Sequence, residues 1–232
     1  MNKGFTLVEL SIVLVLVGLI IGGVIAGKSL IHRSKILNTA AELQQHTTGI
    51  SSFILKFDAL PGDLPIARTY WPNDSQFTGF TTSNGDGNNR IDLGSDDRYA
   101  WQHLSLAKMV EGSFTGGGLT LNVHVPESTI SGGGYWLRVF DIPHHGKRSN
   151  GIRFGKWLSG GYYAGALSPK DAYIIDKKLD DGKADKGSIS TLSGHLDPTP
   201  CTTGSYLTTD GSVEYLLTND NARCNLIYWI DR

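Results

Sequence analysis

An apolar run at the start of the chain restricts what this sequence can fold into more than any other feature. From Leu10 to Gly27 there are 18 residues without a charge, and Ser11 is the only polar side chain among them. As an α-helix, this length is just enough to cross the ~30 Å hydrocarbon core of a membrane. Glu9 stands at the edge of the run. Because a carboxylate within a membrane segment is costly, it indicates a functional role and a positively charged partner.

Two simpler interpretations of this segment explain less. An ordinary secretory signal has a positively charged start, an apolar run of roughly 7–15 residues and then a small-residue cleavage site. Here the run is longer, and Glu9 near its start is a poor fit. A plain signal anchor explains the apolar run, but it gives no reason for Glu9 or for the Lys3-Gly4-Phe5 junction.

The residues from Lys3 to Leu10 read Lys-Gly-Phe-Thr-Leu-Val-Glu-Leu, and they resemble the start of type IV prepilins and of type II secretion pseudopilins. The resemblance implies that a prepilin peptidase cleaves after Gly4 on the cytoplasmic side and that Phe5 becomes an N-methylated N-terminus. It also implies that Glu9 pairs with the amino group of the next subunit's Phe5 in a filament. Since an unpaired buried charge is strongly unfavourable, such a pair selects register and partner.

The same resemblance implies a structural role rather than catalysis. The expected protein is a subunit that an inner-membrane platform protein and an ATPase assemble into a filament, in the periplasm or at the cell surface. Before assembly it is a single-pass inner-membrane protein with a periplasmic head. It resembles a major pilin, a minor pilin or a pseudopilin; its large head and the lack of proline in the apolar half favour the last two.

An alternative function is a membrane-anchored periplasmic enzyme or binding domain with an uncleaved signal anchor. The sequence contains no Gly-x-Ser-x-Gly, His-Glu-x-x-His or Cys-x-x-Cys pattern and no phosphate-binding loop, so nothing in it points to a familiar catalytic site. The net charge of −1 gives no indication of nucleic-acid binding. No cofactor is implied, apart from the Ca²⁺ considered below.

The first helix is expected to continue beyond the membrane. Apolar and small residues recur at steps of three and four and predict one buried stripe along a helix: Ile36, Ala40, Leu43, Thr47, Ile50, Ile54 and Phe57. Two prolines and a glycine within residues 58–65 end the helix. The predicted organisation is a leader at 1–4, a transmembrane helix at 5–27, an amphipathic extension at 28–57 and a globular head at 58–232.

Basic residues return directly after the apolar run, as Lys28, Arg33 and Lys35, whereas the leader has only Lys3. Cytoplasmic flanks are usually the richer in Lys and Arg, so a count of positive charges favours the opposite orientation. The prepilin resemblance takes precedence over this count.

The head is predicted to be α+β with an antiparallel sheet, because short strand-like runs are separated by glycines and short connections. Strands are expected at 119–125, 135–142, 152–158, 162–167, 212–217 and 226–230. A helix is expected at 98–111, capped by Asp96 or Asp97. A second helix begins at Ser168-Pro169-Lys170-Asp171, whose residue types suit a cap, a first turn and a positive helix end.

A polar segment after the first helix resembles part of a calcium-binding loop, because oxygen-bearing side chains alternate along it. The candidate ligands are Asn84, Asp86, Asn88 and Asp92. The sixth and twelfth places hold Asn89 and Ser95 instead of the glycine and glutamate of an EF-hand. A looser Ca²⁺ loop and a solvated turn both remain open, since Asn, Gly and Asp also favour turns.

The sequence offers two further candidate sites, a cluster of aspartates and a pair of cysteines. Aspartates cluster near the end of the second predicted helix and suggest a weaker cation site or simply a solvated helix end: Asp176, Asp180, Asp181 and Asp185. Cys201 and Cys224 are the only cysteines. In an exported domain an even pair is more often a disulfide than a metal site or a nucleophile, and here it would resemble the disulfide-bounded region of many pilins.

Overall fold

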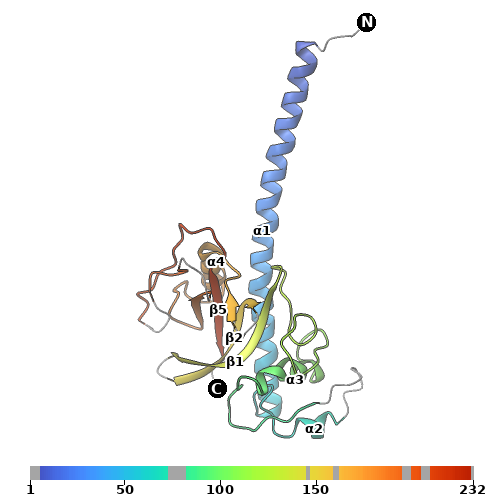
Figure 1. Cartoon of the computed structure of the whole chain (residues 1–232), viewed down its shortest axis with the longest axis vertical. Helices are drawn as coiled ribbons and strands as arrows, with labels where there is room; N and C mark the ends of the chain where they lie inside the picture. Colours follow the sequence, from blue (N-terminus) through green and yellow to red (C-terminus); the bar gives the residue numbers. More distant parts are fainter. Residues whose placement is uncertain are drawn as a thin grey trace.

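A computed structural model describes residues 6–72, 82–144, 147–158, 162–194, 200–204 and 210–230. One helix, α1 (Leu7–Phe57), runs without interruption for 51 residues. Its first part projects away from the rest of the chain, and its last part is packed into a head of α+β structure (Figure 1). We call residues 7–35 of α1 its free half and residues 36–57 its docked half.

Burial separates the two halves sharply. Every residue of α1 before Ile36 is at least partly exposed, whereas the docked half buries a stripe against the head: Ile36, Thr39, Ala40, Leu43, Gly49, Ile50 and Phe53. The predicted stripe is thereby confirmed, with Thr47, Ile54 and Phe57 at its half-buried edges. The helix ends at Asp58, which adopts a left-handed conformation and donates its backbone N–H to Ile54 O at 2.9 Å.

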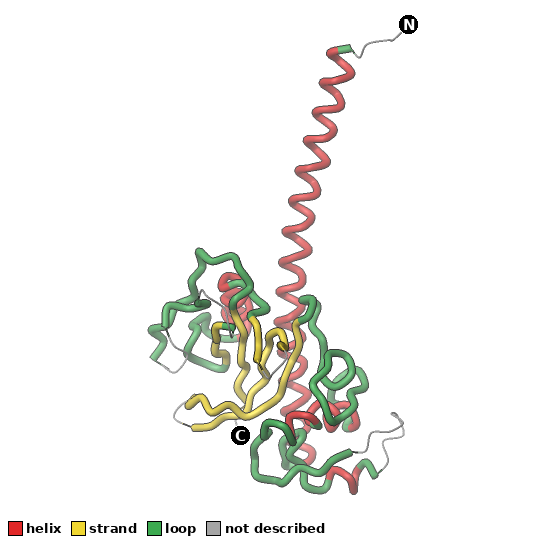
Figure 2. The backbone as a smooth tube through the Cα atoms, viewed as in Figure 1, coloured by secondary structure: helices red, strands yellow, loops and turns green. Residues whose placement is uncertain are grey.

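The head contains an antiparallel sheet of five strands among the described residues (Figure 2). The strand order is β1-β2-β5-β4, and β3 pairs with β2 beyond this path. The strands are β1 (Gly133–His144), β2 (Lys147–Leu158), β3 (Tyr162–Ala164), β4 (Ile189–Ser193) and β5 (Cys224–Ile230). The predicted strands at 135–142, 152–158 and 226–230 are confirmed as β1, β2 and β5.

Three strand predictions need correction. At 119–125 there is no strand, because the backbone N–H groups of residues 123–125 all bond to Thr120 O and fold the segment into a turn. At 212–217 there is only one isolated bridge, between Tyr215 and Thr202. The strand expected at 162–167 ends at Ala164. Strand β4, in a Ser- and Thr-containing segment that was not predicted to form a strand, pairs instead with β5.

The head helices are short. They are α2 (Ala67–Tyr70), the 3-10 turn η1 (Asp96–Arg98), α3 (Ala100–Leu106) and α4 (Pro169–Leu179). The helix predicted over 98–111 is thus wrong in length, since Lys108 takes a positive φ of 59° and turns the chain away. No side chain caps α3, so the prediction of an Asp96 or Asp97 cap is also wrong. Ser168 caps α4 as predicted, accepting the N–H of Asp171.

The docked half of α1 connects two sides of the head. The ring of His46 lies between Trp101 of α3 and Tyr135 of β1, with ring centres 4.8 and 4.7 Å away. The Tyr135 hydroxyl donates a hydrogen bond to the Glu42 carboxylate at 2.5 Å, and Ser128 donates another at 2.9 Å. The head is therefore built around α1, and the helix is part of its core.

Candidate functional site

The free half of α1 exposes apolar side chains around its whole circumference. Between residues 7 and 27 these include 14 large side chains that are 44% to 88% exposed. By length and composition the helix can cross a membrane, and none of its most apolar stretch is buried within the protein. In a single copy of the chain, this surface has no protein partner among the described residues.

Glu9 is the only charged residue between Leu7 and Gly27, and it occupies the first turn of α1. Its carboxylate accepts hydrogen bonds from the Thr6 backbone N–H at 2.8 Å and from the Thr6 hydroxyl at 2.9 Å, while its own N–H donates to that hydroxyl. This reciprocal cap satisfies backbone donors that a helix start leaves unpaired. It fixes the carboxylate at the tip of the helix. The predicted cleavage site, Gly4 and Phe5, lies outside the described residues.

At the other end of the free half, α1 is tied to the start of α4. The His32 Nε2 atom lies 3.0 and 3.1 Å from the two carboxylate oxygens of Asp171, an ion pair when the ring is protonated. Asp171 is also held by the hydroxyl of Ser168, which donates to it at 2.8 Å. This contact marks the point at which α1 leaves the head.

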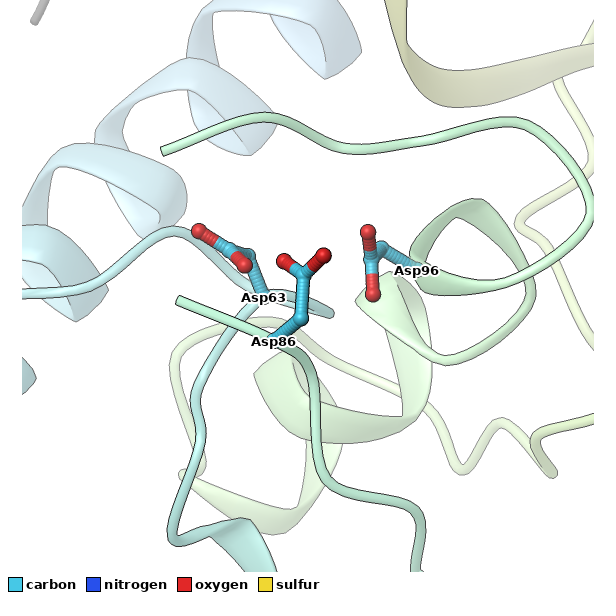
Figure 3. A group of neighbouring side chains, drawn as sticks. All are labelled: Asp63, Asp86 and Asp96. Atoms are coloured by element: carbon cyan, nitrogen blue, oxygen red, sulfur yellow. The ribbon is translucent and has the colours of Figure 1, made fainter. Parts of the chain in front are cut away.

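An acidic cluster lies below the end of α1, where Asp63, Asp86 and Asp96 bring carboxylate oxygens within 4.8 Å of one another (Figure 3). Asp63 and Asp96 are nearly buried, at 1% and 5% exposed. Burial raises the pKa of Asp63 above its usual value and that of Asp96 to about 6. Chemically, three such oxygens suit either a hard cation or shared protons.

The four predicted calcium ligands are only partly brought together. The Asn88 amide donates to Asp86 and to Asp92, at 2.8 Å each, so these three side chains are neighbours. Asn84 is engaged elsewhere, since its side-chain oxygen accepts the Arg68 N–H at 2.8 Å. Binding of Ca²⁺ at this loop stays a prediction.

Sequence reasoning missed Asp63 and Asp96 as members of this cluster. Asp63 accepts backbone N–H bonds from residues 87, 88 and 89, at 2.7 to 3.1 Å, and so organises the loop from the far side. The signal was present in the Leu60-Pro61-Gly62-Asp63 turn, but 23 residues separate Asp63 from Asp86 and no local spacing joins them.

The aspartates after α4 act mainly as anchors for neighbouring loops. Asp176 accepts a hydrogen bond from the Tyr215 hydroxyl at 2.5 Å, and Asp180 accepts the Ile189 N–H at 2.9 Å. Asp185, predicted to belong to the same group, accepts the Gly211 N–H instead. Burial raises the pKa of Asp176 to about 7. Asp176, Asp180 and Asp181 nevertheless remain close, with oxygens within 4.8 Å.

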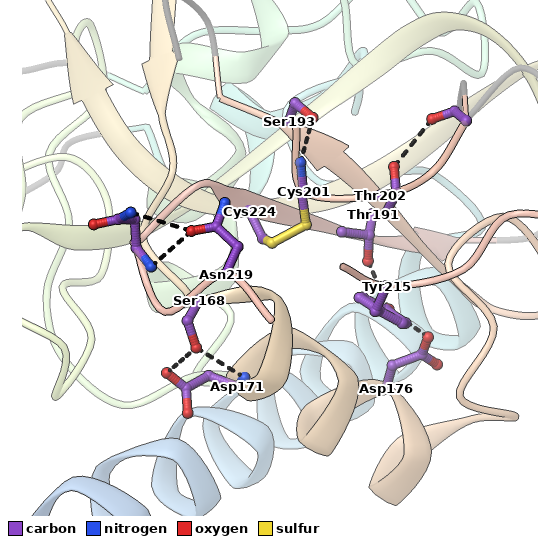
Figure 4. The surroundings of a disulfide bond; sticks show 12 residues. Ser168, Asp171, Asp176, Thr191, Ser193, Cys201, Thr202, Tyr215, Asn219 and Cys224 are labelled. Carbon is purple, nitrogen blue, oxygen red and sulfur yellow. Dashed lines mark hydrogen bonds between the residues drawn. A yellow bond between two sulfur atoms is a disulfide. The ribbon is translucent and has the colours of Figure 1, made fainter. Parts of the chain in front are cut away.

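The two cysteines form the disulfide that was expected, with Cα atoms 5.3 Å apart and both residues buried (Figure 4). It joins the start of β5 to the segment around residue 201, whose backbone N–H also bonds to Ser193 of β4 at 2.9 Å. In the chain-entropy picture, closing a loop of this size contributes about 3 kcal/mol.

The comparisons with known proteins agree with this arrangement at the N-terminus. Residues 1–25 match the family model described as the prokaryotic N-terminal methylation motif. No curated protein and no solved structure matches the chain. The matched segment covers the Thr6–Glu9 cap and most of the exposed apolar stretch of α1. The chain thus carries the N-terminal motif that marks the type IV prepilin and pseudopilin family.

Proposed function

We propose that this protein is a structural subunit of a type IV pilus or a type II secretion pseudopilus. A prepilin peptidase removes residues 1–4, Phe5 becomes the methylated N-terminus, and a platform protein and an ATPase of the inner membrane assemble the subunits. The large head and the lack of proline in the free half of α1 favour a pseudopilin or a minor pilin.

The observation that carries this proposal is the fully exposed apolar half of α1 with one carboxylate at its tip. Fully burying an exposed large apolar side chain contributes about 1.5–3 kcal/mol. The 14 side chains are 44% to 88% exposed, so they correspond to roughly 13–25 kcal/mol of burial that the single chain does not achieve. A membrane supplies that burial before assembly, and the helices of neighbouring copies supply it in a filament.

Glu9 gives such a bundle its specificity. A carboxylate surrounded by apolar helices is strongly unfavourable unless a cation pairs with it. Cleavage after Gly4 creates an amino group at Phe5, one residue before the Thr6 cap. Within one chain, Thr6 already provides the hydrogen bonds to Glu9. The amino group of a neighbouring copy is therefore the cation that offsets burial of this charge.

The mature N-terminus tests the proposal directly. Mass spectrometry of protein from cells with an active prepilin peptidase should find a chain that begins at methylated Phe5. A Gly4→Val variant, which places a branched side chain at the cleavage site, should keep Met1 in the same cells. A wild-type chain that keeps Met1 would indicate a plain signal anchor, and a cut beyond Ile20 would indicate a secreted protein; either result would overturn the proposal.

A further inference from the structure

A cavity of about 470 Å³ lies where α1 leaves the head, between α1 and the start of α4. Figure 1 shows α4 at the end of the head from which the free half emerges. Side chains of both charge signs and two hydroxyl groups line the cavity: Ser29, Arg33, Ser168, Lys170, Asp171 and Asp220. It is therefore a polar cavity with a mixed charge pattern, next to an apolar helix.

Some of the side chains that line this cavity already have hydrogen-bond partners within the protein, and others have none among the described residues. Asp171 is held by His32 and by the Ser168 hydroxyl (Figure 4 shows the second contact). Within the described parts of the chain, by contrast, the side chains of Arg33, Lys170 and Asp220 form no hydrogen bond or ion pair, and all three residues are exposed. Two cations and one carboxylate thus face the cavity without partners.

The position of the cavity relative to the membrane follows from the geometry of α1, provided that residues 7–27 span the membrane as proposed above. The rise from Leu7 to Gly27 is about 30 Å, which equals the hydrocarbon thickness. Arg33 lies about 9 Å beyond Gly27 along the helix. The headgroup layer is about 5–8 Å thick on each side of the hydrocarbon. Ser29, about 3 Å beyond Gly27, therefore lies within this layer and Arg33 lies at its outer edge, where the cavity opens.

We propose that this cavity binds the phosphoethanolamine headgroup of a membrane phospholipid. Arg33 and Lys170 take the phosphate, because a guanidinium donates two parallel hydrogen bonds to phosphate oxygens and an ammonium adds a mobile charge. The carboxylate of Asp220 takes the lipid ammonium group. An anionic headgroup without an amine leaves Asp220 facing a neutral group, and a choline headgroup offers it no N–H donor.

This binding also gives one of the three basic residues that oppose the expected membrane orientation a role on the head side. Arg33 has a ligand there, so its charge does not need a cytoplasmic position. Occupation of the cavity holds the base of the head against the lipid surface before the subunit is drawn into a filament.

The test uses the full-length chain in nanodiscs of phosphatidylcholine, alone or mixed with phosphatidylethanolamine or phosphatidylglycerol. Lipid that stays bound after transfer to detergent is identified by native mass spectrometry, and hydrogen exchange follows the amides of residues 168–174. Wild-type protein should retain phosphatidylethanolamine in preference to both other lipids and should protect these amides most strongly when that lipid is present.

Three variants separate the contacts. The double variant Arg33→Gln/Lys170→Gln should lower retention of every phospholipid by about tenfold or more, since hydrogen bonds to charged groups contribute roughly this much. Asp220→Asn should abolish the preference for the ethanolamine lipid but keep phosphate binding. Lys35→Gln is the matched control, because it removes a positive charge near Arg33 on α1 but outside the cavity. Thermal unfolding confirms that these exposed changes leave the head folded.

Equal retention of the three lipids by inserted wild-type protein would overturn the inference, and so would an equal loss in Lys35→Gln, which indicates general surface charge. Both results leave the proposed pilin-like function intact. A chain that does not enter nanodiscs at all would instead contradict the membrane-spanning role of residues 7–27 and, with it, both proposals.

Discussion

The two halves of α1 share one continuous backbone but differ in what covers them. In the docked half, the head already surrounds the apolar stripe, and the Glu42 carboxylate accepts hydrogen bonds from Tyr135 and Ser128. In the free half, apolar side chains point outward in all directions and Glu9 bonds only to its own turn. The same helix is thus covered by its own chain in the docked half and left for other molecules to cover in the free half.

The largest expected difference between the halves concerns assembly. Glu9→Gln removes the charge at the tip without touching the head, so we expect assembled polymer to fall by at least about tenfold, as loss of one buried charge pair would cause. The measurement is the amount of sheared or cross-linked polymer relative to membrane-bound subunit. Glu111→Gln, an exposed glutamate of the head, is the control. Normal polymer yield in Glu9→Gln would remove the basis for a filament role.

The docked half should also make the head sensitive to acid. Burial lowers the pKa of His46 to about 4, whereas the unfolded chain binds a proton below about pH 6.5. The stability that depends on the neutral ring is therefore fully present above pH 6.5 and is lost as the pH falls toward 4, by up to about 3 kcal/mol.

A His46→Leu variant should unfold with a shallower dependence on pH over this interval. The comparison of the two slopes is essential, because the raised pKa values of Asp96 and Asp176 act in the opposite sense and stabilise the fold as the pH falls. Chemical denaturation at several pH values measures both slopes. Parallel slopes in the two proteins would show that His46 is free to protonate in the folded head.

Glycines in the two halves should respond differently to the same change. A Cβ atom at Gly49 would lie 2.5 Å from the Met109 carbonyl oxygen, whereas one at Gly22 would meet nothing within 4 Å. Gly49→Ala should thus destabilise the head by about 1–3 kcal/mol through overpacking. Gly22→Ala should leave head stability unchanged and favour the helix locally by up to about 1 kcal/mol. Thermal unfolding of the head in detergent distinguishes these outcomes; equal effects would contradict the tight contact at Gly49.

The smallest effect is expected at the second glutamate of α1. Glu42→Gln keeps an acceptor for the Tyr135 and Ser128 hydroxyls but removes the charge that strengthens both bonds. We expect a loss of about 1 kcal/mol in the free energy of unfolding, with polymer yield unchanged as long as the head stays folded. The same Glu-to-Gln exchange should therefore lower the stability of the head at residue 42 and the yield of polymer at residue 9.

The sequence was most informative where a signal is local and repeated. The stripe from Ile36 to Phe57, the Ser168 cap of α4 and the apolar run could all be predicted, because helix periodicity and capping depend on neighbours within a few residues. The pairing of Cys201 with Cys224 was also predictable, since the chain contains no other cysteine.

Predictions failed where the outcome depends on distant partners. Apolar and polar residues alternate over 119–125 as in a strand. The backbone N–H groups of residues 123–125, however, bond to the nearby Thr120 O and not to a neighbouring strand. Strand β4 lacks a strong strand signal and is stabilised by pairing with β5. The disulfide joins the start of β5 to the segment around Cys201, which follows β4. The acidic cluster also needs Asp63 and Asp96, which tertiary folding rather than local sequence spacing brings next to Asp86.

The unbroken course of α1 through the head has a mechanical consequence. Since the described helix has no loop between its free and docked halves, tension applied to its tip travels along one ladder of backbone hydrogen bonds into the interior of the head. The load there falls on the contacts of Ile36, Leu43 and Phe53 rather than on a tether. These buried contacts resist displacement of the docked half, whereas the free half is held only by its own backbone hydrogen bonds and would extend first.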